Sequence, residues 1–321
     1  RRKHLSLSSE RFHMSSIFKF SAAALTAASL LLVAGCASTT PTASPSASAS
    51  SATAAIAVDA KAAALLPEVY KTKGLNAGSE IPYAPMEFYD DNNQAVGFEV
   101  DLLNAVAAKL GTTVKFEKQA FDTLIASLQA GNHDLAVSSM SDTVDRQKAL
   151  DFVDYFQGGA SLIVAKGNPN KVTGLDGLCG QTVTTESASW EVDVLAAANK
   201  DCVKAGKPAL KTLALPSDVE AQNAVRAGNA VAYLSDSQAA AYTAKVAGSG
   251  KYFDLIVDPK SPNGYESGLI GVGILKSNKE LTAAIHAAIQ SLIDDGTYKA
   301  LLAKWNLTSF AVTSATINGT K

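Results

Sequence analysis

An alternation of strand and helix patterns, beginning near residue 75, is the feature that most constrains the fold of this chain. Residues 112–117 predict a strand, and Asp122 is placed to cap a following helix that Gly131 ends. Residues 134–137 predict the next strand. Strands that alternate with helices form βαβ units and parallel sheets. The sequence therefore predicts an α/β fold.

The same unit returns later in the chain. Asp218 begins a second helix pattern, and residues 227–229 repeat the Ala-Gly-Asn of residues 130–132. Residues 230–234 then predict another strand. Two copies of one strand-and-helix unit predict two similar lobes.

Polar residues follow the predicted strand in both copies. The first strand is followed by Ser138 and Ser139, and the second by Ser235 and Asp236. Ligands of open α/β sheets bind outside the carboxyl ends of the strands. The repeated pattern favours a cleft between the lobes, and the alternative is that these residues lie in solvated turns.

The N-terminal region resembles an export signal. Residues 22–33 are almost wholly small or apolar and too short to span a bilayer comfortably, and Met14 is the better start. The run ends in Val-Ala-Gly-Cys, which resembles a lipobox, so Cys36 is predicted to carry lipid. An ordinary signal peptide with a chance cysteine is the alternative. We expect residues 1–36 to be the signal region and residues 37–58, rich in Ala, Ser, Thr and Pro, to be a flexible tether.

Charge and cysteine content agree with export. The chain has 28 Lys and Arg against 30 Asp and Glu, and removal of the signal makes the balance more acidic, which argues against nucleic acid as a partner. Of three cysteines, Cys179 and Cys202 remain if Cys36 carries lipid, and an oxidising compartment would join them. A zinc site is the alternative, but two cysteines without nearby histidines are too few ligands. We predict no metal site.

Four segments carry a resemblance to a known family. They are Ile-Pro-Tyr-Ala-Pro-Met-Glu-Phe (81–88), Gly-Phe-Glu-Val-Asp-Leu (97–102), Ser-Ser-Met-Ser-Asp-Thr-Val-Asp-Arg (138–146) and Asp-Asp-Gly-Thr-Tyr (294–298). In this order, within residues 75–307, they resemble the bacterial solute-binding proteins of family 3, the receptors of polar amino-acid ABC importers.

The resemblance implies a two-lobed, periplasmic-binding-protein-like fold of type II that closes on its ligand. Residues 59–163 and 265–312 would form lobe 1, residues 164–264 would form lobe 2, and residues 313–321 would be a tail. The cysteine pair and the ending 311–319 resemble an actinobacterial lipoprotein subgroup.

The resemblance also implies residues that hold the charged ends of an amino acid. Arg146 would bind the carboxylate with the backbone N–H of Ser141, and Asp236 would bind the ammonium with help from Ser139; Ser138 belongs to the same site. The alternatives are a surface ion pair of Arg146 with a neighbouring aspartate and a helix N-cap for Asp236.

Further residues would contact the ligand side chain. Tyr83 and Phe121 match the family's sandwiching aromatics, and Glu80 lies where many relatives have Asp. Ala188, Ser189 and Trp190 stand where the family usually has Gly-Thr-Thr. Trp190 either covers the ligand side chain or caps a core.

The resulting prediction is an exported receptor, lipid-anchored to the outer face of the cell membrane. It would capture an L-amino acid, with polar or cationic side chains favoured, and deliver it to a permease. The permease and its ATPase would be separate chains, and the receptor would be a monomer without cofactor or enzymatic activity. An enzyme like cyclohexadienyl dehydratase is the alternative, with Glu80 as its general acid. A sensory receptor ectodomain would lack the lipobox tether.

Overall fold

A computed structural model describes residues 56–261 and 264–321 of the chain. The predicted signal region, with Met14 and Cys36, lies outside the described residues, and so does the predicted tether up to residue 55. Within the described part, no helix combines the length and the apolar character that a membrane crossing requires.

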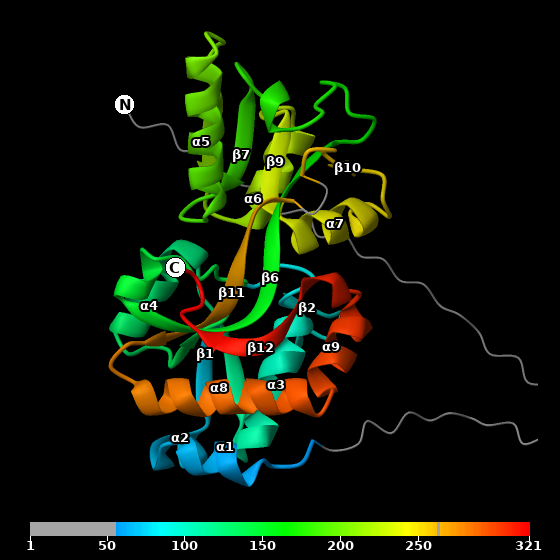
Figure 1. Ribbon diagram of the computed structural model, residues 1–321. Helices are drawn as coiled ribbons and strands as arrows, with labels where there is room; N and C mark the ends of the chain where they lie inside the picture. The colour runs from blue at the N-terminus through cyan, green and yellow to red at the C-terminus, as the bar shows by residue number, and fades with distance from the viewer. Residues whose placement is uncertain (1–55, 262–263) are drawn as a thin grey trace, which may run out of the picture. The chain divides into compact units, whose positions relative to one another are not determined.

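The described residues form two α/β lobes (Figure 1). The first lobe contains α1 (Ala60–Leu65), α2 (Glu68–Lys73), β1 (Leu75–Ser79), β2 (Phe88–Tyr89), β3 (Ala95–Val96), α3 (Phe98–Leu110), β4 (Val114–Lys118), α4 (Leu124–Gln129), β5 (Leu135–Ala136), β11 (Tyr265–Leu275), α8 (Lys279–Asp294), α9 (Thr297–Trp305) and β12 (Ala311–Ile317). The second lobe contains β7 (Thr182–Glu186), α5 (Glu191–Lys204), β8 (Lys211–Leu215), α6 (Asp218–Arg226), β9 (Ala232–Asp236), α7 (Ser237–Val246) and β10 (Phe253–Ile256).

The long strand β6 (Leu150–Ala165) joins the two lobes. Its first part pairs with β11 in the first lobe, and its last part pairs with β9 and β10 in the second. The hydrogen-bonded strand order is β4-β1-β5-β11-β6-β9-β7-β8. Parallel pairing of β1 with β4 and β5, and of β7 with β8 and β9, confirms the α/β prediction in both repeats.

The predicted helix start at Asp122 is wrong. Asp122 lies inside a 3-10 turn, Phe121–Thr123, and α4 follows at Leu124 without a side-chain cap. The helix begins with this tighter turn, so the aspartate is already part of it and cannot cap from outside. Gly131 ends the helix region as predicted, with a φ of 76° that glycine adopts without strain.

Each lobe has its own apolar core. In the first lobe, Leu103 of α3 and Ile285 of α8 are fully buried. In the second, Val183 of β7 and Leu195 of α5 are fully buried. Burial of apolar surface is the main favourable term in folding. Each lobe is therefore stabilised by its own core, which holds the strands of that lobe and their ends in place.

A disulfide joins Cys179 to Cys202 of α5, as the sequence predicted. Cys202 belongs to the core of the second lobe. The bond closes the segment containing β7 onto the helix that follows it. Cys179 lies just before β7 and Cys202 near the end of α5, so the closed loop contains β7, residues 187–190 and most of α5.

The C-terminal residues pair with β6. β12 runs antiparallel to β6 across the first lobe, so the predicted tail starts inside a strand (Figure 1).

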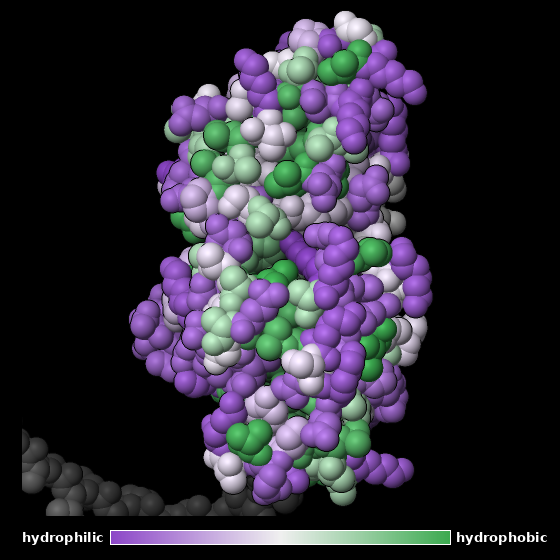
Figure 2. Space-filling view, turned by 90° about the vertical axis from the view of Figure 1, so that its left-hand side faces the viewer, coloured by the Kyte–Doolittle hydropathy of each residue, from purple (hydrophilic) through white to green (hydrophobic). Residues whose placement is uncertain are grey.

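On the face in Figure 2, hydrophobic residues form small patches between hydrophilic ones.

Candidate functional site

A small polar cavity of about 20 Å³ lies where the strand ends of the two lobes meet. The residues that line it lie in the last residues of β7 and β9 or in the segments that follow β1, β4, β5 and β7, and thus near the carboxyl ends of parallel strands, as expected for open α/β sheets. They are Glu80, Tyr83, Phe121, Ser138 and Ser139 from the first lobe, and Thr185, Glu186, Ser189, Glu191, Tyr233, Leu234, Ser235 and Asp236 from the second.

Asp236 holds the two lobes together across this cavity. Its Oδ2 accepts a hydrogen bond from Tyr83 Oη at 2.9 Å, and its Oδ1 accepts one from Trp190 Nε1 at 3.2 Å. Asp236 precedes α7, but its side chain makes no capping bond, so the capping alternative is wrong. Burial raises the pKa of its carboxyl group, while the bonds from Trp190 and Tyr83 lower it.

Trp190 packs on a core, one of the two roles that the sequence left open for it. Its ring is half-buried against the core of the second lobe, and its indole N–H donates to Asp236. It therefore supports a residue of the cavity without being among the residues that line it. The helix that Trp190 precedes, α5, begins at Glu191.

Arg146 lies in the short turn Arg146–Lys148 and is not among the residues that line the cavity, but it contacts Phe121, which is. Its guanidinium lies over the Phe121 ring, 5.3 Å from the ring centre. Nη1 donates to the Ser141 carbonyl and Nη2 to the Ala188 carbonyl, each at 2.9 Å. The second bond crosses to the other lobe, so Arg146 also links both lobes.

The alternative of a surface ion pair for Arg146 is wrong. Asp145 pairs with Lys148 at 2.6 Å, and Asp151 pairs with Lys279 at 2.6 Å. Burial lowers the pKa of Arg146, and the carboxyl groups of Glu191 and Asp236 raise it.

The turn that offers a carbonyl to Arg146 has an unusual backbone. Ala188 has a φ of 61°, in the left-handed region that favours glycine. Ala188 stands where the family resemblance implies glycine, so the departure was visible in the sequence. An L-residue with a side chain in this conformation is strained.

Two buried carboxyl groups that the sequence analysis assigned no site role support the Ser138–Ser139 turn. Ser138 Oγ donates to Glu87 Oε1 at 2.7 Å and accepts from the Glu80 backbone N–H at 3.0 Å. The Ser139 backbone N–H donates to Glu99 Oε1 at 2.8 Å. Burial is the main cause that raises the pKa of both Glu87 and Glu99. Both lie in segments that carry the family resemblance, and their spacing gave no signal of this role.

Ser139 also contacts the second lobe. Its hydroxyl accepts a hydrogen bond from Gln238 Nε2 of α7 at 2.9 Å, and its own φ is 45°. The backbone at Ser139 is therefore in a sparsely populated conformation that Glu99 and Gln238 hold from two sides.

Glu80 and Glu186 form an acidic end of the cavity. Glu80 is 5% exposed and Glu186 is 6% exposed. Among the described residues, no other side chain or backbone group donates to Glu80 Oε2 or Glu186 Oε1, and the two carboxyl groups lie within hydrogen-bond reach of each other. Burial raises the pKa of both groups, and the nearby Glu80 raises that of Glu186 further. Such a pair keeps a proton at neutral pH, because two adjacent carboxyl groups cannot both ionise cheaply.

Two more carboxyl groups add to this acidity. Glu191 is buried, and burial and Asp236 raise its pKa. Asp218 accepts a bond from Tyr233 Oη at 2.7 Å, and burial raises its pKa to about 6. Glu186 and Glu191 were not predicted as site residues, although both flank the Ser189–Trp190 segment, which was. No group of three His, Cys, Asp or Glu residues in the described part of the chain could hold a metal ion.

The lobes, the joining strands and the cleft define a two-lobed binding protein of the type II periplasmic-binding class. Residues 75–308 match the bacterial extracellular solute-binding proteins, family 3. The match covers well over half of the chain, and the chain belongs to this family.

Similar proteins bind amino acids. The chain is 29% identical to the arginine-binding protein ArgT of Corynebacterium glutamicum over 79% of this chain and 82% of ArgT. It is 32% identical to the lysine/arginine/ornithine-binding periplasmic protein of Escherichia coli over 77% of this chain and 90% of that protein.

Solved structures of amino acid-binding proteins are also similar to this chain. An ancestral arginine-binding protein bound to arginine is 30% identical, with a TM-score of 0.63 over 72% of this chain and 97% of that one. The ancestral amino acid-binding protein AncCDT-1, a precursor of cyclohexadienyl dehydratase, is 29% identical, with a TM-score of 0.60 over 72% of this chain and 94% of that one.

Proposed function

We propose that this protein is the substrate-binding component of an ABC importer and captures an L-amino acid with a cationic side chain. The observation that carries the proposal is the acidic end of the cavity, where Glu80 and Glu186 bury adjacent carboxyl groups with two oxygens that no other donor among the described residues reaches. A buried carboxylate needs a cationic partner with good hydrogen bonds. A guanidinium or ammonium group on the ligand would supply one.

The rest of the site suits the main-chain groups of an amino acid. Arg146 would bind the carboxylate with its planar, bidentate donor set, together with the N–H of Ser141. Asp236 would accept from the ammonium, with Ser138 and Ser139 beside it. Tyr83 and Phe121 would contact the aliphatic part of the side chain, and Ser189 and Trp190 would close the cavity from the second lobe. The similarity to binding proteins named for arginine and lysine supports the same ligand class.

Ligand capture would proceed by closure of the lobes. Contacts that cross between the lobes, such as Tyr83 with Asp236 and Arg146 with the Ala188 carbonyl, would form on closure. A ligand that contacts both lobes favours the closed state by its differential affinity for it. We propose residues 59–163 and 265–312 as one moving body and residues 164–264 as the other. The closed form would dock on a permease.

The test is isothermal titration calorimetry of the exported domain with L-arginine, L-lysine, L-glutamine and L-glutamate. We expect micromolar or tighter binding of L-arginine or L-lysine and none of L-glutamate. Glu186→Leu should lose at least tenfold in affinity for the cationic ligand, whereas the exposed Asp193→Asn should leave it unchanged. Binding of neutral amino acids alone would contradict the cationic class, and failure of all twenty amino acids would contradict the function.

An enzymatic function is the second candidate, because a neighbouring structure is a precursor of cyclohexadienyl dehydratase. A protonated carboxyl group such as Glu80 could act as its general acid. Binding is the better proposal because Arg146 and Asp236 together match both charged ends of an amino acid. The assay measures the ultraviolet absorbance of an aromatic product formed from a cyclohexadienyl substrate. Formation of that product would overturn the proposal that the protein only binds its ligand.

We also propose that lipid on Cys36 anchors the protein to the outer face of the cell membrane, as a monomer beside its permease. The small residues before Cys36 and the uncharged segment after it support this proposal. Cys36→Ser should release the protein from the membrane pellet into the soluble fraction. Equal pelleting of the variant and the parent would contradict lipid attachment.

A further inference from the structure

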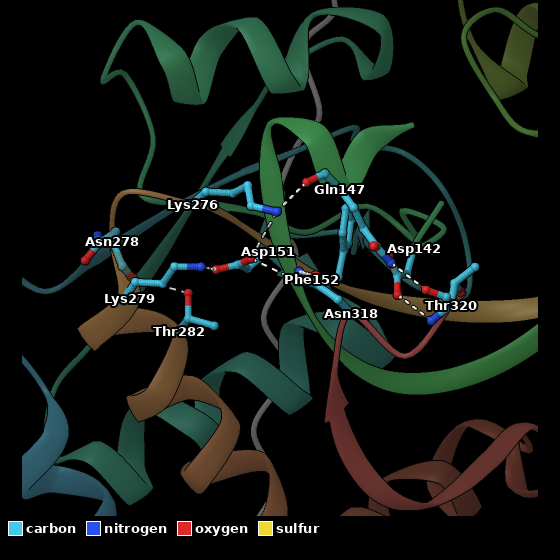
Figure 3. Close-up of polar contacts among 10 residues, drawn as sticks. All are labelled: Asp142, Gln147, Asp151, Phe152, Lys276, Asn278, Lys279, Thr282, Asn318 and Thr320. Atoms are coloured by element: carbon cyan, nitrogen blue, oxygen red, sulfur yellow. Dashed lines mark hydrogen bonds and ion pairs between the residues drawn. The ribbon is translucent and has the colours of Figure 1, made fainter. Parts of the chain in front are cut away.

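The C-terminal residues after β12 bend back onto the turn that carries Arg146 (Figure 3). Asn318 continues the pairing with β6: its backbone N–H donates to the Phe152 carbonyl at 3.0 Å, and its Oδ1 accepts from the Phe152 N–H at 2.9 Å. Its Nδ2 also donates to Asp151 Oδ1 at 3.0 Å. With a φ of 53°, Asn318 then turns the chain away from the strand. We call residues 311–320 the strap.

We call residues 142–149, which contain Arg146, the Arg146 turn. The end of the strap forms hydrogen bonds with Asp142 and Gln147 of this turn, and these two residues also bond to each other. The Thr320 backbone N–H donates to Asp142 Oδ2 at 3.0 Å. The Thr320 carbonyl accepts from Gln147 Nε2 at 2.9 Å, and the same Nε2 donates to Asp142 Oδ1 at 2.7 Å. Figure 3 shows the three residues together. Asp142 follows Ser141, whose carbonyl accepts from the guanidinium, and Gln147 follows Arg146 itself.

A buried carboxyl group fixes the strap just before this contact. Asp154 Oδ2 accepts from Thr316 Oγ1 at 2.6 Å and from the Gly319 N–H at 2.9 Å. A Cβ at Gly319 would lie 2.6 Å from Leu269 Cδ1 and 2.8 Å from Asp154 Oδ2, so the backbone approaches closely here. Thr320 is thereby placed against the turn.

Other contacts hold the outer side of the same turn. Lys276 Nζ donates to the Gln147 carbonyl at 2.7 Å, and the Asp142 N–H donates to the Leu269 carbonyl at 2.9 Å. Both partners come from β11 or the residue after it. The turn therefore lies between β11 and the strap, and the guanidinium of Arg146 extends from it to the second lobe.

We propose that the strap is a positioning element for ligand binding: Thr320, Asp142 and Gln147 hold Arg146 where it meets the ligand carboxylate. This inference rests on the proposed function. A strap that only covered the edge of β6 would stabilise the lobe without favouring one ligand group over another. A strap that positions Arg146 affects recognition of the carboxylate in particular.

The first test needs no ligand. Amide hydrogen exchange is compared in the parent, in a chain truncated after Ile317, in Gln147→Leu, and in the control Lys148→Ala, whose side chain is exposed. We expect exchange of the amides of residues 142–149 to rise at least tenfold in the first two variants, with β7 and α5 unchanged. Gln147→Leu keeps the whole strap and remains informative if the truncated chain does not fold. Unchanged exchange of the turn in Gln147→Leu would overturn the inference.

The second test separates positioning from general stability. Affinity is measured for L-arginine and for L-argininamide, in which a neutral amide replaces the carboxylate. We expect Gln147→Leu to lose at least tenfold for L-arginine and less than twofold for the amide. Equal losses for both ligands would overturn the positioning role. Failure of the parent to bind L-arginine would instead contradict the proposed ligand class, and the exchange measurement would then decide the inference alone.

Discussion

Substitution of Asp236 by Asn separates the binding role of this residue from its structural role. Asp236 is 4% exposed and accepts bonds from Tyr83 Oη and Trp190 Nε1. Asn is nearly isosteric and can replace both bonds, because its oxygen can accept from the indole and its NH₂ group can donate to the tyrosine oxygen. The change therefore removes the charge and keeps the contacts.

The two effects of this substitution have different magnitudes. Loss of one partner from a buried charge pair costs about 2–5 kcal/mol, or roughly 30- to 4,000-fold in affinity. The free protein loses less, because charge-assisted bonds of about 1.5–3 kcal/mol become neutral bonds of about 0.5–1.5 kcal/mol. Removal of the buried charge offsets this loss, since Asp236 raises the pKa of Glu191 and its own pKa is raised by burial. We expect the free energy of unfolding to change by about 1 kcal/mol or less.

The assay combines calorimetry with L-arginine or L-lysine and chemical denaturation of the free protein. The matched control is Asp193→Asn, an exposed residue of α5 that should bind like the parent. Near-parental affinity of Asp236→Asn would refute the assignment of Asp236 to the ligand ammonium. A loss of several kcal/mol in the free protein would refute the reasoning on its charge.

Three further predictions follow from the same contacts. Arg146→Ala should lower affinity at least thirtyfold by calorimetry while Asp145→Ala, an exposed neighbour, binds normally; equal affinities would exclude Arg146 from the site. Joint replacement of Cys179 and Cys202 by Ser should cost about 3 kcal/mol by the chain-entropy model, measured by urea denaturation, and an unchanged midpoint would argue against it. Burial raises the pKa of Asp154 to about 6, so the native state binds the extra proton and the free energy of unfolding should fall as pH rises from about 4 to 6. Asp154→Asn should flatten that fall, which denaturation across this pH range checks.

The α/β fold was predictable because its signals are local. Strand and helix periodicity, the repeated Ala-Gly-Asn and the glycine at position 131 each depend on a few neighbouring residues. The start of α4 was not predictable from Asp122, because a 3-10 turn before a helix leaves no distinct pattern in the sequence.

The missed carboxyl groups have a different physical cause. Glu186 ends β7 and Glu191 begins α5, where glutamate is common for solvated strand ends and helix starts. Nothing local distinguishes a buried from an exposed glutamate in those places. Their burial results from the approach of the first lobe, which brings Glu80 to the same cavity from a distant part of the chain.

The convergence of carboxyl groups itself argues for a ligand. Glu80, Glu186, Glu191 and Asp236 line one cavity, come from different segments, and are each raised in pKa by burial. Burial of such groups destabilises their charged forms, and mutual repulsion adds to that cost. Apolar residues of similar size would stabilise the closed lobes better than this cluster does. A ligand cation can replace the protons that these carboxyl groups keep without a ligand. Its attraction to the ionised carboxylates then outweighs their mutual repulsion, and its contacts link the two lobes. The same carboxyl groups that weaken the closed form without a cation therefore strengthen it with one.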